Sequence, residues 1–181
     1  MRALYIALLL FANIHWTSAC ASEYSIAPIR IDIPSGFEGP NQQSQGQATV
    51  VAFLKPHSDS AVKTLLQISF LDFGTQLQNV PKSDLDSSAA KYLLELAGGV
   101  ERRRVDFKRS EPSSVMLGGL PGAKLTWTGR IDGMDAVGVM YCVVVGTRII
   151  SFHTQDVAAA PTPAMNDAVQ AIESVKIDGG A

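Results

Sequence analysis

Three strand-like segments joined by very short turns constrain the fold more than any other feature of this chain. They are residues 123–131, 136–145 and 148–155, separated by Asp132-Gly133-Met134-Asp135 and by Gly146-Thr147. Residues 123–131 alternate between apolar and polar side chains, which is typical of a strand with one buried face. Because a parallel crossover needs about a dozen residues or more, the two turns predict antiparallel neighbours.

The rest of the chain adds further strands to this core. They are expected over residues 29–33, 49–54, 64–73 and 102–107. Polar residues 38–47 and glycine-rich residues 116–122 are expected to form loops, and residues 177–181 a frayed tail.

Two segments have helical periodicity. The first is expected to begin at the N-cap Ser83 and to stop at Gly98-Gly99, since serine caps helix starts and glycine favours helix ends. The second covers residues 163–175, with Thr162 as its N-cap and an apolar stripe that includes Met165. The combined order of elements predicts the α+β class, with one mostly antiparallel β-sheet packed with two helices.

The N-terminus has the pattern of a cleavable signal peptide. Arg2 precedes an uncharged apolar run over residues 3–12, and Ala19-Cys20-Ala21 fits the small-residue pattern of signal peptidase sites. The apolar run is far shorter than the roughly 20 residues that a membrane-spanning helix needs. We therefore expect removal of residues 1–21. Residues 22–181 are expected to work as a single domain, without a transmembrane span, in the periplasm of a Gram-negative cell or secreted from it.

Cys20 leaves an alternative open. Thr17-Ser18-Ala19-Cys20 partly matches the lipobox of bacterial lipoproteins, although Thr17 stands where an aliphatic residue is usual. Lipidation of Cys20 would tether the protein to a membrane. Cys142 is the one other cysteine of the chain, so an internal disulfide is not expected, and its apolar neighbours in the sequence predict a buried, inert thiol.

The sequence carries no catalytic or metal-binding signature. It has no G-x-S-x-G motif, and His57 and His153 are the histidines of residues 22–181, which leaves nucleophilic catalysis without a placed base. His57 is expected in a solvated turn, and His153 in a surface or hydrogen-bonded structural role. The net charge of −2, which becomes −3 when Arg2 is removed, gives no electrostatic footprint for nucleic acid. No metal, cofactor or nucleic acid is therefore expected.

One set of basic residues is a candidate for binding a partner. It comprises Arg102, Arg104, Lys108, Lys124 and Arg130. Strand alternation is expected to point Arg102, Arg104 and Lys108 to one side, and the last two members share a side of their own strand. Two interpretations stay open: a solvated sheet face with ion pairs, to which Asp106 would contribute, or a surface that binds an acidic partner, a lipid headgroup or a polysaccharide.

Four short motifs spread over residues 22–181 match a known family. They are Ile33-Pro34-Ser35-Gly36-Phe37, Gly119-Leu120-Pro121-Gly122-Ala123, Gly146-Thr147-Arg148-Ile149-Ile150-Ser151-Phe152, and the terminal helix that closes on Ser174-Val175-Lys176-Ile177. In these motifs the chain resembles the PsbP-like superfamily, particularly its DcrB-like bacterial periplasmic branch. The resemblance implies an α/β/α sandwich and a non-catalytic role, because the family comprises mainly accessory subunits, a regulator, chaperones and envelope proteins. It carries over no catalytic residue.

The sequence thus favours a non-catalytic, exported envelope protein that binds or assists a partner complex, the partner being a protein or another envelope component. One alternative is a carrier of a small apolar ligand, with Phe107, Trp127 and Phe152 lining a cavity on one side of the sheet. The other is an enzyme of unrecognised type, which would require convergent polar groups with perturbed pKa values in a cleft.

Overall fold

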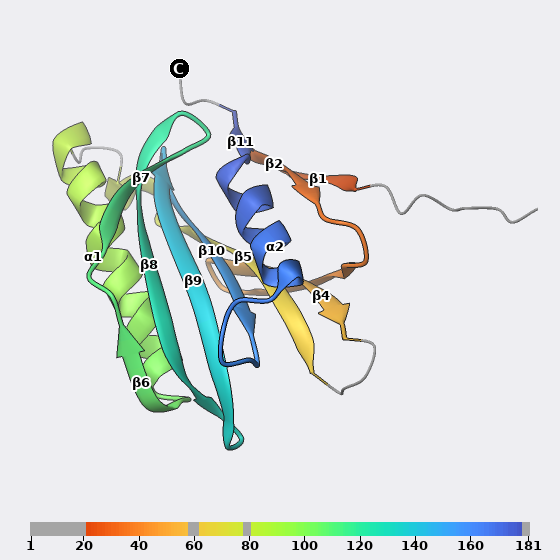
Figure 1. Ribbon diagram of the computed structural model, residues 1–181. Helices are drawn as coiled ribbons and strands as arrows, with labels where there is room; N and C mark the ends of the chain where they lie inside the picture. Colours follow the sequence, from red (N-terminus) through yellow and green to blue (C-terminus); the bar gives the residue numbers. More distant parts are fainter. Residues whose placement is uncertain (1–20, 58–61, 78–80, 179–181) are drawn as a thin grey trace, which may run out of the picture.

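The computed structural model describes residues 21–57, 62–77 and 81–178 of the chain (Figure 1). Residues 1–20 of the predicted signal peptide, Cys20 among them, lie outside the described residues. The cleavage of the signal peptide and the lipidation of Cys20 therefore stay predictions. Within the described residues, no helix is both long enough and apolar enough to span a membrane.

The described chain folds into strands and two α-helices, α1 (Lys82–Glu101) and α2 (Pro163–Glu173), with a short 3-10 helix at Gly74–Leu77. The strands are β1 (Ser22–Ile26), β2 (Ile29–Ile33), β3 (Glu38–Gln45), β4 (Ala48–Pro56), β5 (Lys63–Asp72), β6 (Val105–Arg109), β7 (Ser113–Leu117), β8 (Leu120–Ile131), β9 (Met134–Val145), β10 (Arg148–Asp156) and β11 (Lys176–Ile177). One sheet of eight strands has the order β3-β4-β5-β10-β9-β8-β6, with β7 also paired to β8. A second, small sheet consists of β1, β2 and β11.

The predicted hairpins are present. β8 pairs with β9 and β9 pairs with β10, both antiparallel, and every other pairing among the described strands is antiparallel too. Asp132 and Gly133 have φ angles of 50° and 82°, the two positive values that a two-residue hairpin turn of type I′ requires. The predicted α+β class with a mostly antiparallel sheet is confirmed.

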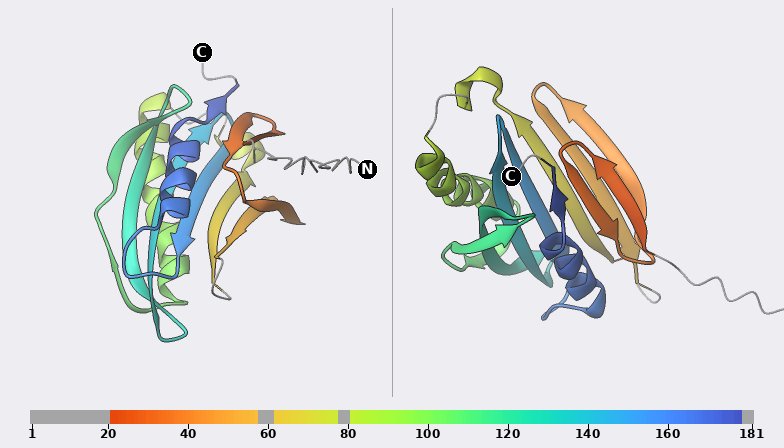
Figure 2. Two further views of the ribbon diagram at one scale, coloured as in Figure 1. Left: turned by 45° about the vertical axis from the view of Figure 1, so that its right-hand side comes forward. Right: turned by 90° about the horizontal axis from the view of Figure 1, so that it is seen from above.

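The large sheet is covered on both faces (Figure 2). α1 packs against β8 and β9 on one face, here called the α1 face, where Leu93 and Trp127 belong to one buried apolar cluster. α2 packs against β10 and β5 on the other, the α2 face, where Phe152 and Ile172 belong to a second cluster that also includes side chains of the small sheet. Strand alternation therefore assigns each residue of the large sheet to one of two cores.

The loop predicted for residues 38–47 is wrong, because Glu38–Gln45 forms β3 at one edge of the large sheet. All the residues of β3 are exposed. A strand with both faces in water has no need of apolar alternation, so the pattern that predicts strands elsewhere is absent here.

Two further corrections concern short connections. The loop predicted for residues 116–122 is wrong, because β7 ends at Leu117 and β8 begins at Leu120, which leaves Gly118-Gly119 as a two-residue turn. The frayed tail predicted from Ile177 is wrong at its first residue, because Lys176–Ile177 forms β11 and pairs with β2. The partner of β11 lies far away in the sequence, so this pairing cannot be recognised from neighbouring residues.

The predicted ends of α1 are also wrong. The helix begins at Lys82 with Pro81 at the N-cap, so Ser83 lies within the first turn. At the other end it continues through Gly98 and Gly99 to Glu101. Ala97 is fully buried against the sheet, and this packing of the last turns outweighs the weak helix propensity of the two glycines.

We expect Gly98→Ala to raise the free energy of unfolding by about 1 kcal/mol, since alanine is the better helix former by that amount. An added Cβ would contact Arg102 Nη1 at 3.9 Å, an ordinary van der Waals distance. Urea denaturation of both proteins measures the difference. A destabilised variant would mean that α1 requires glycine at this position for a reason that packing does not provide.

The predicted start of α2 is confirmed, whereas the helix ends at Glu173, two residues before the predicted end, because the chain enters β11 at Lys176. The Thr162 hydroxyl accepts a hydrogen bond from Met165 N at 3.2 Å, and Pro163 occupies the first turn, as expected for a capped helix start. Met165 and Ile172 of the apolar stripe are buried against the α2 face.

Candidate functional site

A groove on the α1 face is the candidate functional site. α1 lies over β8 and β9, and the groove runs beside its last turns, over the neighbouring strands β5 and β10. Its volume is about 390 Å³. The polar side chains of its lining include Gln67, Ser69, Arg104, Ser151, His153 and Gln155.

Strand register brings the polar side chains of the groove floor together. In the pairing of β10 with β5, Ser151 lies opposite Ser69, and His153 lies opposite Gln67. Residues directly opposite one another in a sheet point to the same face, so these side chains form two polar rows across the floor. Apart from His153, the floor residues were not singled out in the sequence. Their signal was polar residues at alternate positions of otherwise apolar strands.

His153 is buried and neutral. Trp127 Nε1 donates a hydrogen bond to His153 Nε2 at 3.2 Å, so the ring carries its proton on Nδ1. Burial, together with the nearby charge of Arg104, lowers the pKa of His153 from 6.5 to about 4. His153 therefore has the predicted hydrogen-bonded role rather than a surface position.

This buried histidine predicts a stability that depends on pH. Because the pKa of His153 is 6.5 before folding and about 4 afterwards, the unfolded chain takes up a proton first as the pH falls. Its contribution is fully present above pH 6.5 and is lost towards pH 4, a total of about 3 kcal/mol. Urea denaturation at a series of pH values measures this loss. His153→Gln keeps an acceptor for Trp127 without a titrating ring, so it should flatten the slope, and an equally steep slope would contradict the assignment.

Arg104 forms the wall of the groove next to His153. Its Nη2 donates to Gln155 Oε1 at 2.9 Å, and its Nη1 donates to the carbonyl oxygen of Arg103 at 3.0 Å. The guanidinium lies over the Trp127 ring, 5.5 Å from the ring centre. Its Nε is buried without a hydrogen-bond partner among the described residues. Burial, and then repulsion by Arg103, lowers the pKa of Arg104 from its usual value.

The structure divides the predicted basic set between two faces. Arg102 is the exposed C-cap residue of α1, and Arg104 points over Trp127 on the α1 face. The expectation that Arg102, Arg104 and Lys108 point together is wrong. The strand begins only at Val105, and the register shifts between Val105 and Lys108, with Asp106 at a φ of 54°. Such a bulge reverses the side on which the following side chains emerge.

The other basic residues of the set lie on the α2 face, where carboxylates neutralise two of them. Lys124 Nζ lies 2.8 Å from Glu173 Oε1, which also accepts a hydrogen bond from the Tyr141 hydroxyl at 2.8 Å. Lys124 lowers the pKa of Glu173, and burial raises that of Tyr141. Arg130 pairs with Asp106 at 3.2 Å. Lys108 and Arg130 line a second hollow, of about 300 Å³, which also contains Asp106 and Asp135. The ion pairs fit the solvated-face interpretation for this part of the set.

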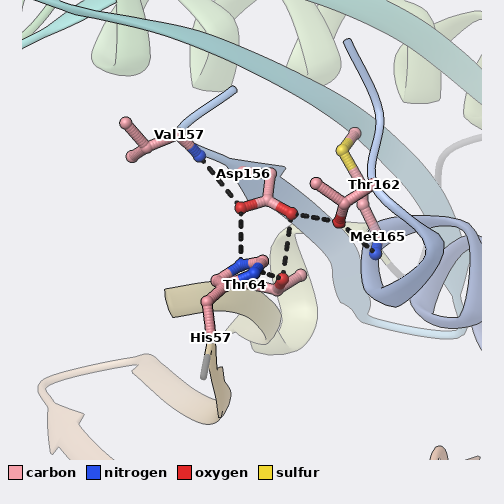
Figure 3. Close-up of polar contacts among 6 residues, drawn as sticks. All are labelled: His57, Thr64, Asp156, Val157, Thr162 and Met165. Carbon is pink, nitrogen blue, oxygen red and sulfur yellow. Dashed lines mark hydrogen bonds and ion pairs between the residues drawn. The ribbon is translucent and has the colours of Figure 1, made fainter. Parts of the chain in front are cut away.

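A buried carboxylate network ties the start of α2 to the sheet (Figure 3). Asp156, which has no exposed surface, accepts hydrogen bonds from Thr64 Oγ1 at 2.9 Å, from the backbone N of Val157 at 3.0 Å and from the hydroxyl of Thr162. His57 Nε2 lies 3.1 Å from Asp156 Oδ1. We call these residues the Asp156 network.

The Asp156 network corrects the expectation for His57, which is half-buried and paired rather than a solvated turn residue. Thr64 has no exposed surface, and its hydroxyl donates to Asp156. No substrate can therefore approach this hydroxyl as it would a nucleophile. The network's geometry suits a structural connection between β4, β5, β10 and α2.

The proposed aromatic cavity is also corrected by the structure. Phe107 stacks on Trp127 with a centroid distance of 5.8 Å on the α1 face, whereas Phe152 is buried in the cluster of the α2 face. The three rings cannot line one cavity. Cys142 is fully buried, and burial raises the pKa of its thiol to about 12, as an inert core thiol requires.

Among the described residues, no group of three acidic, histidine or cysteine side chains is placed to hold a metal ion.

Sequence comparison matches this chain to no known family model and to no curated protein.

Solved structures, in contrast, match this chain over most of its length. LpqN of Mycobacterium tuberculosis, described as involved in cell envelope biogenesis, is 16% identical, with a TM-score of 0.56 over 87% of this chain and 84% of LpqN. The cyanobacterial PsbP protein (CyanoP) of Synechocystis sp. PCC 6803 is 11% identical, with a TM-score of 0.58 over 88% of this chain and 93% of its own. At such identities the likeness concerns architecture alone. The chain has a PsbP-like fold.

Proposed function

We propose that this protein is an exported, non-catalytic envelope protein that binds a partner complex through the groove beside α1. In this proposal residues 1–21 direct export and residues 22–181 form the working domain. Among proteins with a PsbP-like fold, this protein belongs to the DcrB-like branch. The envelope role described for LpqN agrees with this assignment.

The observation that carries the proposal is the chemistry of the groove. Its floor presents hydroxyl, amide and imidazole groups, and Arg103 and Arg104 add two guanidinium groups, yet no carboxylate belongs to its described lining. The one imidazole has its Nε2 occupied by Trp127 and stays neutral. Such a surface offers hydrogen bonds and positive charge to a partner, but no base that could activate a nucleophile.

The export half of the proposal is tested by intact mass after expression in a Gram-negative host. The soluble periplasmic and membrane fractions are analysed separately. A mass that begins at Ser22 in the periplasmic fraction is expected. A lipidated product that begins at Cys20, found in the membrane fraction, would show that the protein is tethered to a membrane rather than free. Retention of the full-length chain in the cytoplasm would contradict export.

The binding half is tested by photo-crosslinking in cells of the native host. A crosslinking residue is placed at Ser69 on the groove floor and, as the matched control, at Thr126 on the α2 face. We expect one partner to crosslink from Ser69 and not from Thr126, with reciprocal capture when the partner carries the tag. Equal crosslinking from both positions, or from Thr126 alone, would contradict the groove as the binding surface.

A further inference from the structure

We propose that the groove contains a carboxylate-binding subsite, built around Arg104 and His153, that receives an acidic side chain of the partner protein. The inference rests on the proposed function and adds the chemistry by which the groove recognises its partner.

The first argument is the unusual position of Arg104 among the basic side chains. Some cations of the described chain lie within ion-pair distance of a carboxylate, namely Arg30, Lys55, Arg109, Lys124, Arg130 and Arg148. Others without such a pair, among them Lys63, Lys91 and Lys108, are exposed to solvent, whereas Arg104 is partly buried. Arg104 instead donates to two neutral oxygens, the Gln155 amide and the Arg103 carbonyl. Its charge is half-buried and has no ion pair within the described structure, and Asp132 attracts it only from beyond ion-pair distance.

The second argument is that the guanidinium is held in place before a ligand arrives. Gln155 and the Arg103 carbonyl fix two of its nitrogens, and the Trp127 ring supports its plane at 5.5 Å. A fixed guanidinium loses little conformational entropy when an anion binds, which favours affinity. The buried, unpaired Nε leaves one donor of the group without a partner in the described structure.

The third argument concerns the donors around Arg104. His153 accepts from Trp127 through Nε2, so Nδ1 carries the remaining ring proton. Ser69 and Ser151 add hydroxyl groups on the same floor. An anion with oxygen acceptors would therefore meet the half-buried charge of Arg104 and several neutral donors, with Arg103 as a second, solvent-exposed cation of the lining.

Because only one of the two cations is partly buried, the groove favours a carboxylate over a phosphate. A carboxylate carries one negative charge and matches a guanidinium in both shape and charge. A phosphate group carries more charge and is generally held by several cations or by a helix N-terminus. Beside Arg104 the lining contains one further cation, Arg103, whose side chain is exposed to solvent. The groove volume of about 390 Å³ leaves room for an acidic side chain together with part of its backbone.

The test is an NMR titration of the purified protein, followed at the indole N–H of Trp127, which is assigned with Trp127→Phe. The probe is N-acetylglutamate α-amide, whose one carboxylate is on the side chain. N-acetylglutamine α-amide serves as the neutral control, acetate as a bare carboxylate, and inorganic phosphate as the competing anion. We expect saturable shifts with the glutamate derivative, weaker binding of acetate, and no saturation with the glutamine derivative.

Variants connect the response to Arg104. Arg104→Gln should weaken binding of the glutamate derivative about tenfold or more, as expected for a lost charge-assisted hydrogen bond, and Arg104→Lys should retain part of it. Arg130→Gln, which removes an ion-paired cation on the α2 face, should leave binding unchanged. Thermal unfolding establishes that each variant is folded. Equal affinity in Arg104→Gln, tighter binding of phosphate, or no saturable response to the glutamate derivative would each overturn the subsite.

The same variant separates the two proposals. If Ser69 crosslinks a partner as strongly in Arg104→Gln as in the unmodified protein, the groove binds a partner without this subsite. If the glutamate derivative binds and no partner crosslinks from Ser69, the subsite exists and the proposed function is wrong.

Discussion

Replacing Asp156 by alanine is expected to lower the free energy of unfolding by about 3–5 kcal/mol, the range measured when one member of a buried charged network is removed. The Asp156 carboxylate has no exposed surface and accepts from Thr64, Val157 and Thr162, with His57 Nε2 at 3.1 Å (Figure 3). Its removal leaves buried donors without an acceptor, and each such group costs about 1–3 kcal/mol.

The effect of this substitution should extend to α2. The hydroxyl of Thr162 donates to Asp156 and also caps the helix by accepting from Met165 N at 3.2 Å. Without the carboxylate, the hydroxyl loses the partner that orients it. Hydrogen exchange should therefore be faster in the first turn of α2 than in the C-terminal turns of the same helix.

Asp167→Ala provides the matched control for the Asp156 prediction. Asp167 lies on α2, its side chain is 49% exposed, and its distance to Lys55 Nζ is 3.8 Å. A surface pair of this kind contributes about 0–1 kcal/mol. Equal losses from the two alanine substitutions, measured by urea denaturation, would mean that the Asp156 network does not stabilise the fold.

The sequence could predict those parts of the molecule whose causes are local. The hairpins follow from alternation and from glycine in two-residue turns, and the start of α2 follows from Thr162 and Pro163. In contrast, β3 is specified by its pairing with β4, and β11 by its pairing with β2. A prediction from neighbouring residues cannot detect these pairings, because the partner strands lie elsewhere in the chain.

The sequence prediction of the basic set failed because of one local irregularity, the register shift in β6. Extrapolating regular alternation from Arg102 placed Arg104 with Lys108, whereas the bulge before Lys108 puts them on opposite faces. The Asp156 network was equally hidden, since His57 and Asp156 are 99 residues apart and meet only when β4 and β10 both pair with β5. Both cases show that the polar residues could be recognised in the sequence, but their neighbours could not.

Gly138→Ala is expected to destabilise the fold by about 3–5 kcal/mol, comparable to the loss of a buried tryptophan. Gly138 lies directly opposite Trp127 in the pairing of β8 with β9. A Cβ at Gly138 would lie 2.3 Å from both Nε1 and Cε2 of the Trp127 ring, closer than atoms can approach. Phe107 and Arg104 lie against the same ring, so the indole has no free direction in which to move. Either the ring leaves its site or the strands separate.

This substitution should also abolish carboxylate binding, because Trp127 supports Arg104 and donates the hydrogen bond that fixes the His153 tautomer. Urea denaturation measures the stability, and titration with the glutamate derivative, under conditions where the variant is folded, measures the groove. Gly98→Ala adds the same methyl group on α1, where it meets no close contact and should stabilise the protein. A Gly138→Ala protein as stable as the unmodified one, with unchanged binding, would show that the packing of Trp127 against Gly138 neither limits the sheet nor organises the groove.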